Sequence, residues 1–412
     1  MTNSTKMDSD FNPLTFMKNM ELAAQIWPKI AEKLSETSSL NKQTHEPLAQ
    51  QVGQAFLTFQ QNLINNNQDD MLKSNLDWWQ NSFEMGQQYL NEFMERQHPN
   101  ANAEEKSAHA ENDRRFRHDL WTSNPFYEHL KEQYKLTAQM IDDTLSKAND
   151  NLDERSAHLV QFYGKQWRDA LSPSNYPWSN PEVLEQAMDT NGESVIRGLE
   201  NLIHDLERGR ITMTADDAFT LGKDIACTKG SVVFQNELMQ LIQYEAATEK
   251  VYQTPLLITP AWINKYYVLD LQPQNSLVKW LTKQGFTVFI ISWVNPDKSH
   301  HHITFEDYMT LGLYEALEKV LELTDEPKIH LAGYCLGGTL TACLSAWLEA
   351  QGKADIIAST TYLTTLIDFK DAGDLKLFTD AKQLEAMEET LEKRGYLEGN
   401  EMAAIFNALR PQ

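Results

Sequence analysis

A short glycine-rich segment around Cys335 constrains the fold more than any other part of the sequence. Residues 333–338 read Gly-Tyr-Cys-Leu-Gly-Gly, follow the apolar run 329–332 and precede a helical pattern over 339–352. A strand, a tight turn and a helix in this order expose the central side chain in a strained position at the carboxyl end of the strand. The flanking glycines permit the turn and the close helix–strand contact; they are Gly333, Gly337 and Gly338. Cys335 is therefore the candidate nucleophile, and the alternative is a buried cysteine beside an ordinary turn.

The composition excludes several classes of partner. Thirty-six basic and 59 acidic side chains give a formal net charge of −23, which excludes nucleic acid and anionic membranes as main partners. The three cysteines show no pairing pattern, so a reducing compartment is favoured, and Cys227 and Cys343 are expected to be packing residues. No apolar stretch approaches the ~20 residues of a transmembrane segment, and the N-terminal residues lack a secretory layout. We expect a soluble, cytoplasmic protein.

The first half of the chain is patterned for helices. Apolar residues step by three and four through 14–34, 56–64 and 76–93. These stripes either pack against neighbouring helices or form a surface for a partner or a hydrophobic particle. Asn180-Pro181 predicts the start of one helix that runs to about Arg208. The expected regions are a helical N-terminal region (1–97), a polar linker (98–112) and a second helical domain (113–209).

After residue 210 the pattern changes to alternating strands and helices. Near-continuous apolar runs at 256–259, 288–291 and 329–332 indicate strands that are covered on both faces. Shorter strands are expected at 231–234, 241–244 and 356–363, with helices at 276–284 and 305–323 between them. This alternation predicts a doubly wound, mostly parallel α/β sheet over residues 210–365. Residues 366–412 are expected to begin a cap over the active site.

Three segments together resemble the class I polyhydroxyalkanoate synthases. They are the Gly-x-Cys-x-Gly-Gly box at 333–338, the motif Pro-Ala-Trp-Ile-Asn-Lys-Tyr-Tyr-Val-Leu-Asp-Leu at 260–271, and the run Thr-Val-Phe-Ile-Ile-Ser-Trp-Val-Asn-Pro at 287–296. Segments at 113–116, 171–175 and 180–182 also resemble the family, so the similarity runs from about residue 113 to the end. The resemblance implies an incomplete α/β-hydrolase-type sheet preceded by an all-helical N-terminal domain.

The resemblance also implies a reaction. Cys335 would accept an acyl group from (R)-3-hydroxyacyl-CoA, most simply 3-hydroxybutyryl-CoA, and a hydroxyl would then attack the acyl-enzyme to extend a polyester chain with release of CoA. The backbone N–H of Leu336 would stabilise the oxyanion. Pro260 has no N–H, and the family often has a second proline where this chain has Ala261, so the resemblance implies Trp262 or Ile263 as the second donor. No cofactor and no metal are expected. Expected partners are a homodimer, a phasin or the granule surface.

The sequence departs from this family after the nucleophile. Acid and histidine follow the nucleophile in this fold, yet residues 336–412 contain no histidine, and the last one is His330. By the resemblance, the catalytic Asp and His are not present in this chain, which we expect to be C-terminally truncated and nearly inactive alone. The acids at 368, 371 and 374 follow the strand at 356–363 too closely to serve. The triplet His300-His301-His302 belongs to a different strand end.

Two functions of other classes stay open. One is a non-catalytic interaction protein that binds granules or partners through its helices. The other is a thiol-dependent esterase or depolymerase on the same fold, against which the 264–267 motif Asn-Lys-Tyr-Tyr argues. That motif and Asp270 are equally compatible with loop structure and capping. Arg114 and Arg115 are expected to be surface or interface charges.

Overall fold

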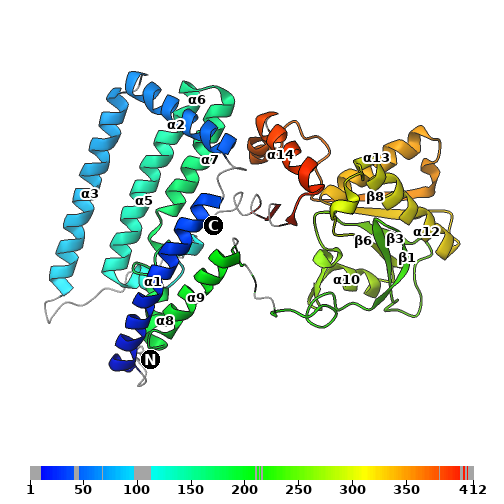
Figure 1. The fold of residues 1–412 in the computed structure, drawn as a ribbon, viewed down its shortest axis with the longest axis horizontal. Coiled ribbons are helices and arrows are strands. Elements are labelled where there is room, and N and C mark those ends of the chain that lie inside the picture. Colours follow the sequence, from blue (N-terminus) through cyan, green and yellow to red (C-terminus); the bar gives the residue numbers. More distant parts are fainter. Residues whose placement is uncertain are drawn as a thin grey trace. The chain divides into compact units, whose positions relative to one another are not determined.

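The computed structural model of the chain forms two compact units (Figure 1). One comprises residues 1–212, 374–387 and 406–412, and the other residues 213–373 and 388–405. The structure describes residues 11–40, 46–66, 68–96, 113–208, 211, 212, 214, 217–379, 381–399, 402, 403 and 406. The predicted linker 98–112 lies outside them.

The first unit is helical. Its helices are α1 (Pro13–Leu40), α2 (Glu46–Asn66), α3 (Gln68–Arg96), α4 (Leu120–Ser123), α5 (Pro125–Ser146), α6 (Ala148–Asn151), α7 (Glu154–Ala170), α8 (Pro181–Asp189) and α9 (Glu193–Arg208), with 3-10 turns at Arg114–Phe116 and Pro173–Asn175. Phe59 and Leu63 of α2 pack with Leu145 of α5 and Val160 of α7 in one buried cluster. None of the helices in the described part of the chain is both long and apolar enough to cross a bilayer.

The prediction of one helix from 180 to 208 is wrong, because the chain turns between α8 and α9. Asn180 caps α8 as predicted, accepting from the N–H of Glu182 at 3.0 Å. Asn191 and Gly192 then adopt φ values of 50° and 85°, which end the helix. The Oδ1 of Asn191 accepts from the N–H of Asn12 at 2.6 Å, and its carbonyl accepts from Asn19 at 2.9 Å. The break therefore holds α1 against the α8–α9 pair.

Arg115, which the sequence suggests is a surface or interface charge, is a half-buried charge inside the helical unit. Its guanidinium contacts Asp113 at 2.8 Å, Asp169 at 3.2 Å and the hydroxyl of Tyr134 at 2.9 Å. Asp169 is buried, and Arg168 contacts the same carboxylate at 2.8 Å. Burial alone would raise the pKa of Asp113, but its hydrogen bonds and ion pair with Arg115 hold that pKa below the usual value. Arg115 thus joins three segments of the helical unit.

The second unit is built on a six-stranded sheet in the order β1-β2-β6-β3-β7-β8. Its strands are β1 (Gly230–Gln235), β2 (Met239–Tyr244), β3 (Leu256–Thr259), β6 (Val288–Trp293), β7 (Ile329–Tyr334) and β8 (Ile357–Leu363). β3, β6, β7 and β8 run parallel, and β1 and β2 are antiparallel. All six strands were predicted from the apolar runs. A two-stranded ribbon, β4 (Asp270–Gln272) and β5 (Asn275–Ser276), lies outside the sheet.

Helices cover both faces of this sheet, as the near-continuous apolar strands require. On one face, α13 (Leu336–Ala350) and a continuous helix of α11 (Phe305–Asp307), a π-helical stretch (Tyr308–Tyr314) and α12 (Glu315–Thr324) cover Leu257, Phe289 and Leu331. On the other, α10 (Leu277–Lys283) buries Val278 against Ile258 and Ile290. Successive residues of each strand therefore point to opposite faces of the sheet and pack in two separate cores.

Candidate active site

Cys335 lies at the sharp corner between β7 and α13. Its backbone has φ 54° and ψ −125°, a conformation that is strained for any residue with a side chain. The Cys335 N–H donates to the carbonyl of Leu363 at the end of β8, at 3.0 Å. The thiol is free and half-buried. The 15-residue helix α13 starts at the next residue, so the positive end of its dipole lies beside Cys335.

The glycines of the corner allow backbones to approach closely. A Cβ on Gly337 would lie 2.0 Å from the carbonyl oxygen of Thr259, and one on Gly333 would lie 2.3 Å from the Cα of Gly338. A Cβ on Gly338 would meet the hydroxyl of Thr365 at 1.9 Å. The first turn of α13 is therefore wedged between the ends of β3 and β8.

The loop after β3 lies beside this corner. β3 and β7 are parallel neighbours, with Thr259 opposite Gly333, so their carboxyl ends share one end of the sheet. The loop begins with a turn in which the N–H of Asn264 donates to the carbonyl of Ala261 at 3.0 Å. The buried indole of Trp293 donates to the carbonyl of Pro260 at 2.8 Å and fixes the start of the turn.

The candidate oxyanion donors lie at the corner and in the loop after β3. The N–H of Leu336 occupies the first position of α13 and has no acceptor within the helix. Trp262 and Ile263 lie in the turn after β3 and are half-buried. The Trp262 ring packs edge-on against Phe305, with centroids 5.8 Å apart, and lies 5.3 Å from Tyr308. The assignment of these N–H groups as donors stays a prediction.

None of the histidines that the structure describes in this unit contacts Cys335. His330 precedes Cys335 by five residues along β7, which places it about 16 Å away. It hydrogen-bonds the hydroxyl of Ser359 at 2.7 Å. The triplet at 300–302 follows β6, which is separated from β7 by β3. His300 pairs with Asp297 at 3.0 Å, and hydrogen bonds from Ser299 and His300 lower the pKa of that carboxyl.

The remaining candidates have structural contacts. Asp368 accepts from the backbone N–H of Lys370 at 2.8 Å, and Asp374 pairs with His158 of the helical unit at 2.7 Å. Cys343 packs against the core of α13 and the sheet. Cys227 is half-buried and donates to the carbonyl of Lys223 at 3.0 Å.

Sequence reasoning missed two residues that shape the corner. Trp293 holds the loop after β3 and also fills the space over Gly312, where a Cβ would meet its ring at 2.5 Å. Thr365 packs against Gly338. The position of Trp293 near the end of the apolar run 287–296 is a signal that could have found it, whereas no pattern in the sequence distinguishes Thr365.

Comparison with known proteins relates these residues to a known family. Residues 112–281 match the model of the poly-beta-hydroxybutyrate polymerase (PhaC) N-terminus, and residues 254–396 match the alpha/beta hydrolase fold. A poly(3-hydroxyalkanoate) polymerase of Methylorubrum extorquens is 46% identical over 303 residues, which are 73% of this chain and 50% of that protein. These residues belong to the poly(3-hydroxyalkanoate) polymerase family.

Two further relationships extend the comparison. The poly(3-hydroxyalkanoate) polymerase subunit PhaC of Cupriavidus necator is 38% identical over 330 residues, 79% of this chain and 56% of that protein. The chain spans about half the length of the curated relatives it matches. A solved structure of a putative esterase from Staphylococcus aureus covers 54% of this chain and 69% of its own, at 15% identity and a TM-score of 0.28.

Proposed function

We propose that this chain supplies the covalent nucleophile, Cys335, of a poly(3-hydroxyalkanoate) polymerase that acts in polyester synthesis. The observation that carries the proposal is the strained backbone of Cys335 at the junction of β7 and α13, with φ 54°. Sequence relatives with this activity in their names support it. The acyl donor is (R)-3-hydroxyacyl-CoA, with 3-hydroxybutyryl-CoA as the simplest case.

The proposed first step is a transfer between two thiols. The Cys335 thiolate attacks the thioester carbonyl, and the N–H groups of Leu336 and of Trp262 or Ile263 stabilise the oxyanion. The carbon–sulfur bond to CoA then breaks, and CoA leaves as a thiolate that takes up a proton. In the second step the hydroxyl of another hydroxyacyl unit attacks the Cys335 thioester. An ester forms, the enzyme thiol is released, and a base must remove the hydroxyl proton.

Mass spectrometry of the intact protein tests this proposal. Incubation with (R)-3-hydroxybutyryl-CoA should add one acyl group to the chain, and Cys335→Ala should abolish the adduct. Cys343→Ala is the matched control, because it removes a half-buried thiol of the same helix and should keep the adduct. An adduct that persists in Cys335→Ala contradicts the proposal. Release of hydroxybutyrate without a longer chain would instead identify a thiol-dependent esterase or depolymerase.

A second proposed role is attachment to the polyester granule through α3. Large apolar side chains on one face of α3 are more than half exposed. They are Leu72 (59%), Leu76 (67%), Trp79 (66%), Phe83 (68%) and Leu90 (58%). The spacing of four, three, four and seven residues puts them on one side. The other side of α3 packs on α5, where Trp78 donates to Thr137 at 3.3 Å and Ser82 meets Gln133 at 2.8 Å.

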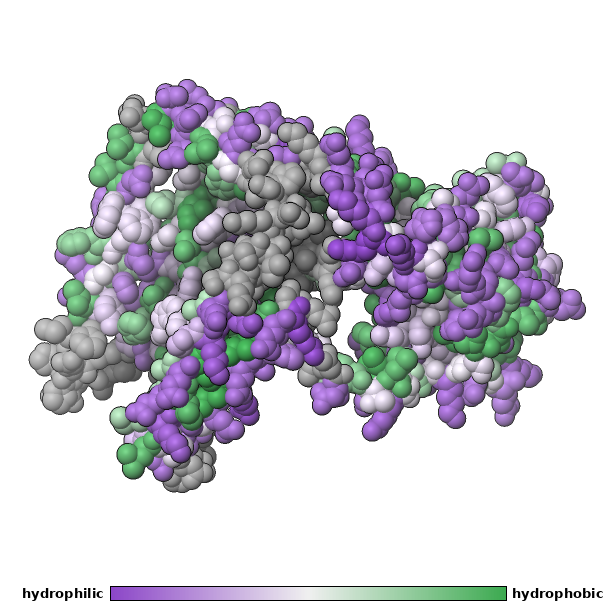
Figure 2. Space-filling view, viewed as in Figure 1, coloured by the Kyte–Doolittle hydropathy of each residue, from purple (hydrophilic) through white to green (hydrophobic). Residues whose placement is uncertain are grey.

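This face has the chemistry of a hydrophobic contact surface, because monomeric proteins rarely leave such a row uncovered. Hydrophobic residues (green) are visible along the α3 side of the helical unit in Figure 2. A granule gives every one of these side chains an apolar neighbour at once. A phasin or a second copy of the chain are the alternative occupants.

Cosedimentation with isolated granules tests this role without catalysis. The double variant Trp79→Gln/Phe83→Gln should lower the bound fraction at least tenfold, since each large side chain contributes about 1.5–3 kcal/mol when buried. Trp178→Gln is the matched control, because Trp178 is equally exposed at 72% but lies outside α3. Binding that survives the double variant refutes the role. Loss of a dimer in sedimentation velocity, with granule binding unchanged, would assign the face to a second copy.

A further inference from the structure

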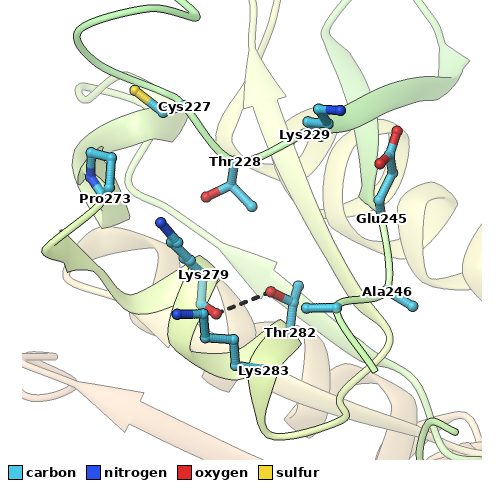
Figure 3. Close-up of a pocket in the computed structure, with 10 residues that line it drawn as sticks. Cys227, Thr228, Lys229, Glu245, Ala246, Pro273, Lys279, Thr282 and Lys283 are labelled. Carbon is cyan, nitrogen blue, oxygen red and sulfur yellow. Dashed lines mark hydrogen bonds between the residues drawn. The ribbon is translucent and has the colours of Figure 1, made fainter. Parts of the chain in front are cut away.

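A pocket of about 270 Å³ opens at the end of the sheet opposite Cys335 (Figure 3). Gly230 at the start of β1 pairs with Tyr244 at the end of β2, and β2 runs back along β6 toward the start of that parallel strand. The pocket lies where these ends meet α10, and its wall includes Lys229, Lys279 and Lys283. It is separate from the site at the carboxyl ends of β3 and β7.

A buried carboxylate holds two walls of this pocket together. Asp270 is 1% exposed and accepts from the hydroxyl of Thr228 at 2.6 Å, from the N–H of Thr228 at 3.2 Å and from the hydroxyl of Ser276 at 2.6 Å. Ser276 in turn caps α10 by accepting from the N–H of Lys279 at 2.9 Å. Thr228 and α10 are thus fixed relative to each other before any ligand arrives, which lowers the cost of binding.

The charge of the pocket opposes that of the chain. Three lysines and one acid, Glu245, line it, although the chain carries a net charge of −23. Among the residues that the structure describes, none of the three ammonium groups takes part in an ion pair. Figure 3 shows Lys279 rising from α10 with its ammonium group between Pro273 and Thr228, and Lys229 on the opposite side of Thr228. Lysine is a strong partner for phosphate because it presents a compact charge with three donors.

We propose that this pocket binds a phosphate group. Lysines from α10 and from the segment before β1 give the wall of the pocket a local positive charge, which suits a compact dianion better than a single carboxylate, and Glu245 limits the attraction. The phosphate has two possible sources, free inorganic phosphate and the phosphates of coenzyme A. The coenzyme A case rests on the proposed function, whereas the free phosphate case does not.

Calorimetric titration of the full chain at constant ionic strength tests the proposal, with inorganic phosphate and coenzyme A as separate probes. Lys279→Gln and Lys229→Gln should each weaken binding about fivefold, the effect of losing one partly exposed charge contact. Glu245→Gln should strengthen binding a few-fold. Lys328→Gln is the matched control, because Lys328 is exposed and lies outside the pocket.

The outcomes distinguish free phosphate from the phosphates of coenzyme A, and they test the pocket independently of acylation at Cys335. Saturable binding of inorganic phosphate that responds to these variants identifies a free phosphate. Tighter binding of coenzyme A that Lys279→Gln weakens identifies its phosphates. Cys335→Ala should leave either affinity unchanged, so a failed acylation test does not decide this one. The proposal is overturned if neither probe binds saturably, or if Lys328→Gln changes the affinity as much as Lys279→Gln. Equal affinities of wild type and Glu245→Gln also count against it.

Discussion

The backbone strain at Cys335 predicts an inverted response to glycine. At φ 54° and ψ −125°, a residue with a Cβ costs about 1–3 kcal/mol, and glycine adopts this conformation freely. Glycine also gains about 0.5–1 kcal/mol of backbone entropy in the unfolded state, which opposes the benefit. The difference leaves Cys335→Gly more stable than Cys335→Ala by up to about 2.5 kcal/mol. Both variants lack the sulfur, so the comparison isolates the Cβ.

Thermal unfolding followed by tryptophan fluorescence measures this difference. A change of 1 kcal/mol corresponds to a shift in melting temperature of about 2–4 °C for a unit of this size. Thr361 is the control position, because it is an exposed residue of β8 in regular register with Ala332 of β7. There Thr361→Gly should be less stable than Thr361→Ala by about 0.5–1 kcal/mol. If Cys335→Gly is less stable than Cys335→Ala, as at the control position, the corner stores no strain and the argument fails.

Two further changes test the packing described above. Gly337→Ala should destabilise the sheet unit by about 1–3 kcal/mol, measured in thermal melts. The added Cβ would lie 2.0 Å from the carbonyl oxygen of Thr259, and this backbone atom cannot rotate away. Gly198→Ala, in the open space of α9, should instead stabilise by up to about 1 kcal/mol, and an equal loss at both sites would disprove the contact. Arg115→Gln should cost about 1–2 kcal/mol at pH 7, a value reduced for partial exposure. The pKa of Asp113 is lowered in the folded state, so this stability is present above its unfolded pKa of about 3.9 and is lost as pH falls through the folded value. A cost that stays constant down to pH 3 in urea titrations would contradict that linkage.

The sequence predicted what depends on local pattern. Apolar runs located all six strands, and the glycines around Cys335 located the corner between β7 and α13. The break at Asn191 and Gly192 was missed because the apolar stripe continues across it, and only the contacts with Asn12 and Asn19 of α1 explain it.

Residues that act through distant partners were equally out of reach. Arg115 meets Asp169 and Tyr134, which lie 54 and 19 positions away in the sequence. Thr365 matters because β8 returns beside β7 and brings its end against Gly338. Such pairings follow from the register of strands and helices, which no local pattern specifies.

The two halves of the proposed reaction place different demands on this site. Thioester exchange moves an acyl group between two thiols of similar acidity, and the positive end of α13 lies where negative charge develops in this step. Ester formation needs a proton removed from a hydroxyl, which is far less acidic and requires a base within hydrogen-bond reach. His330 is about 16 Å along β7, and residues 336–412 contain no histidine. The printed chain should therefore take up one acyl group slowly and stoichiometrically without making polymer. Polymer formed by this chain alone would mean that another of its residues serves as the base.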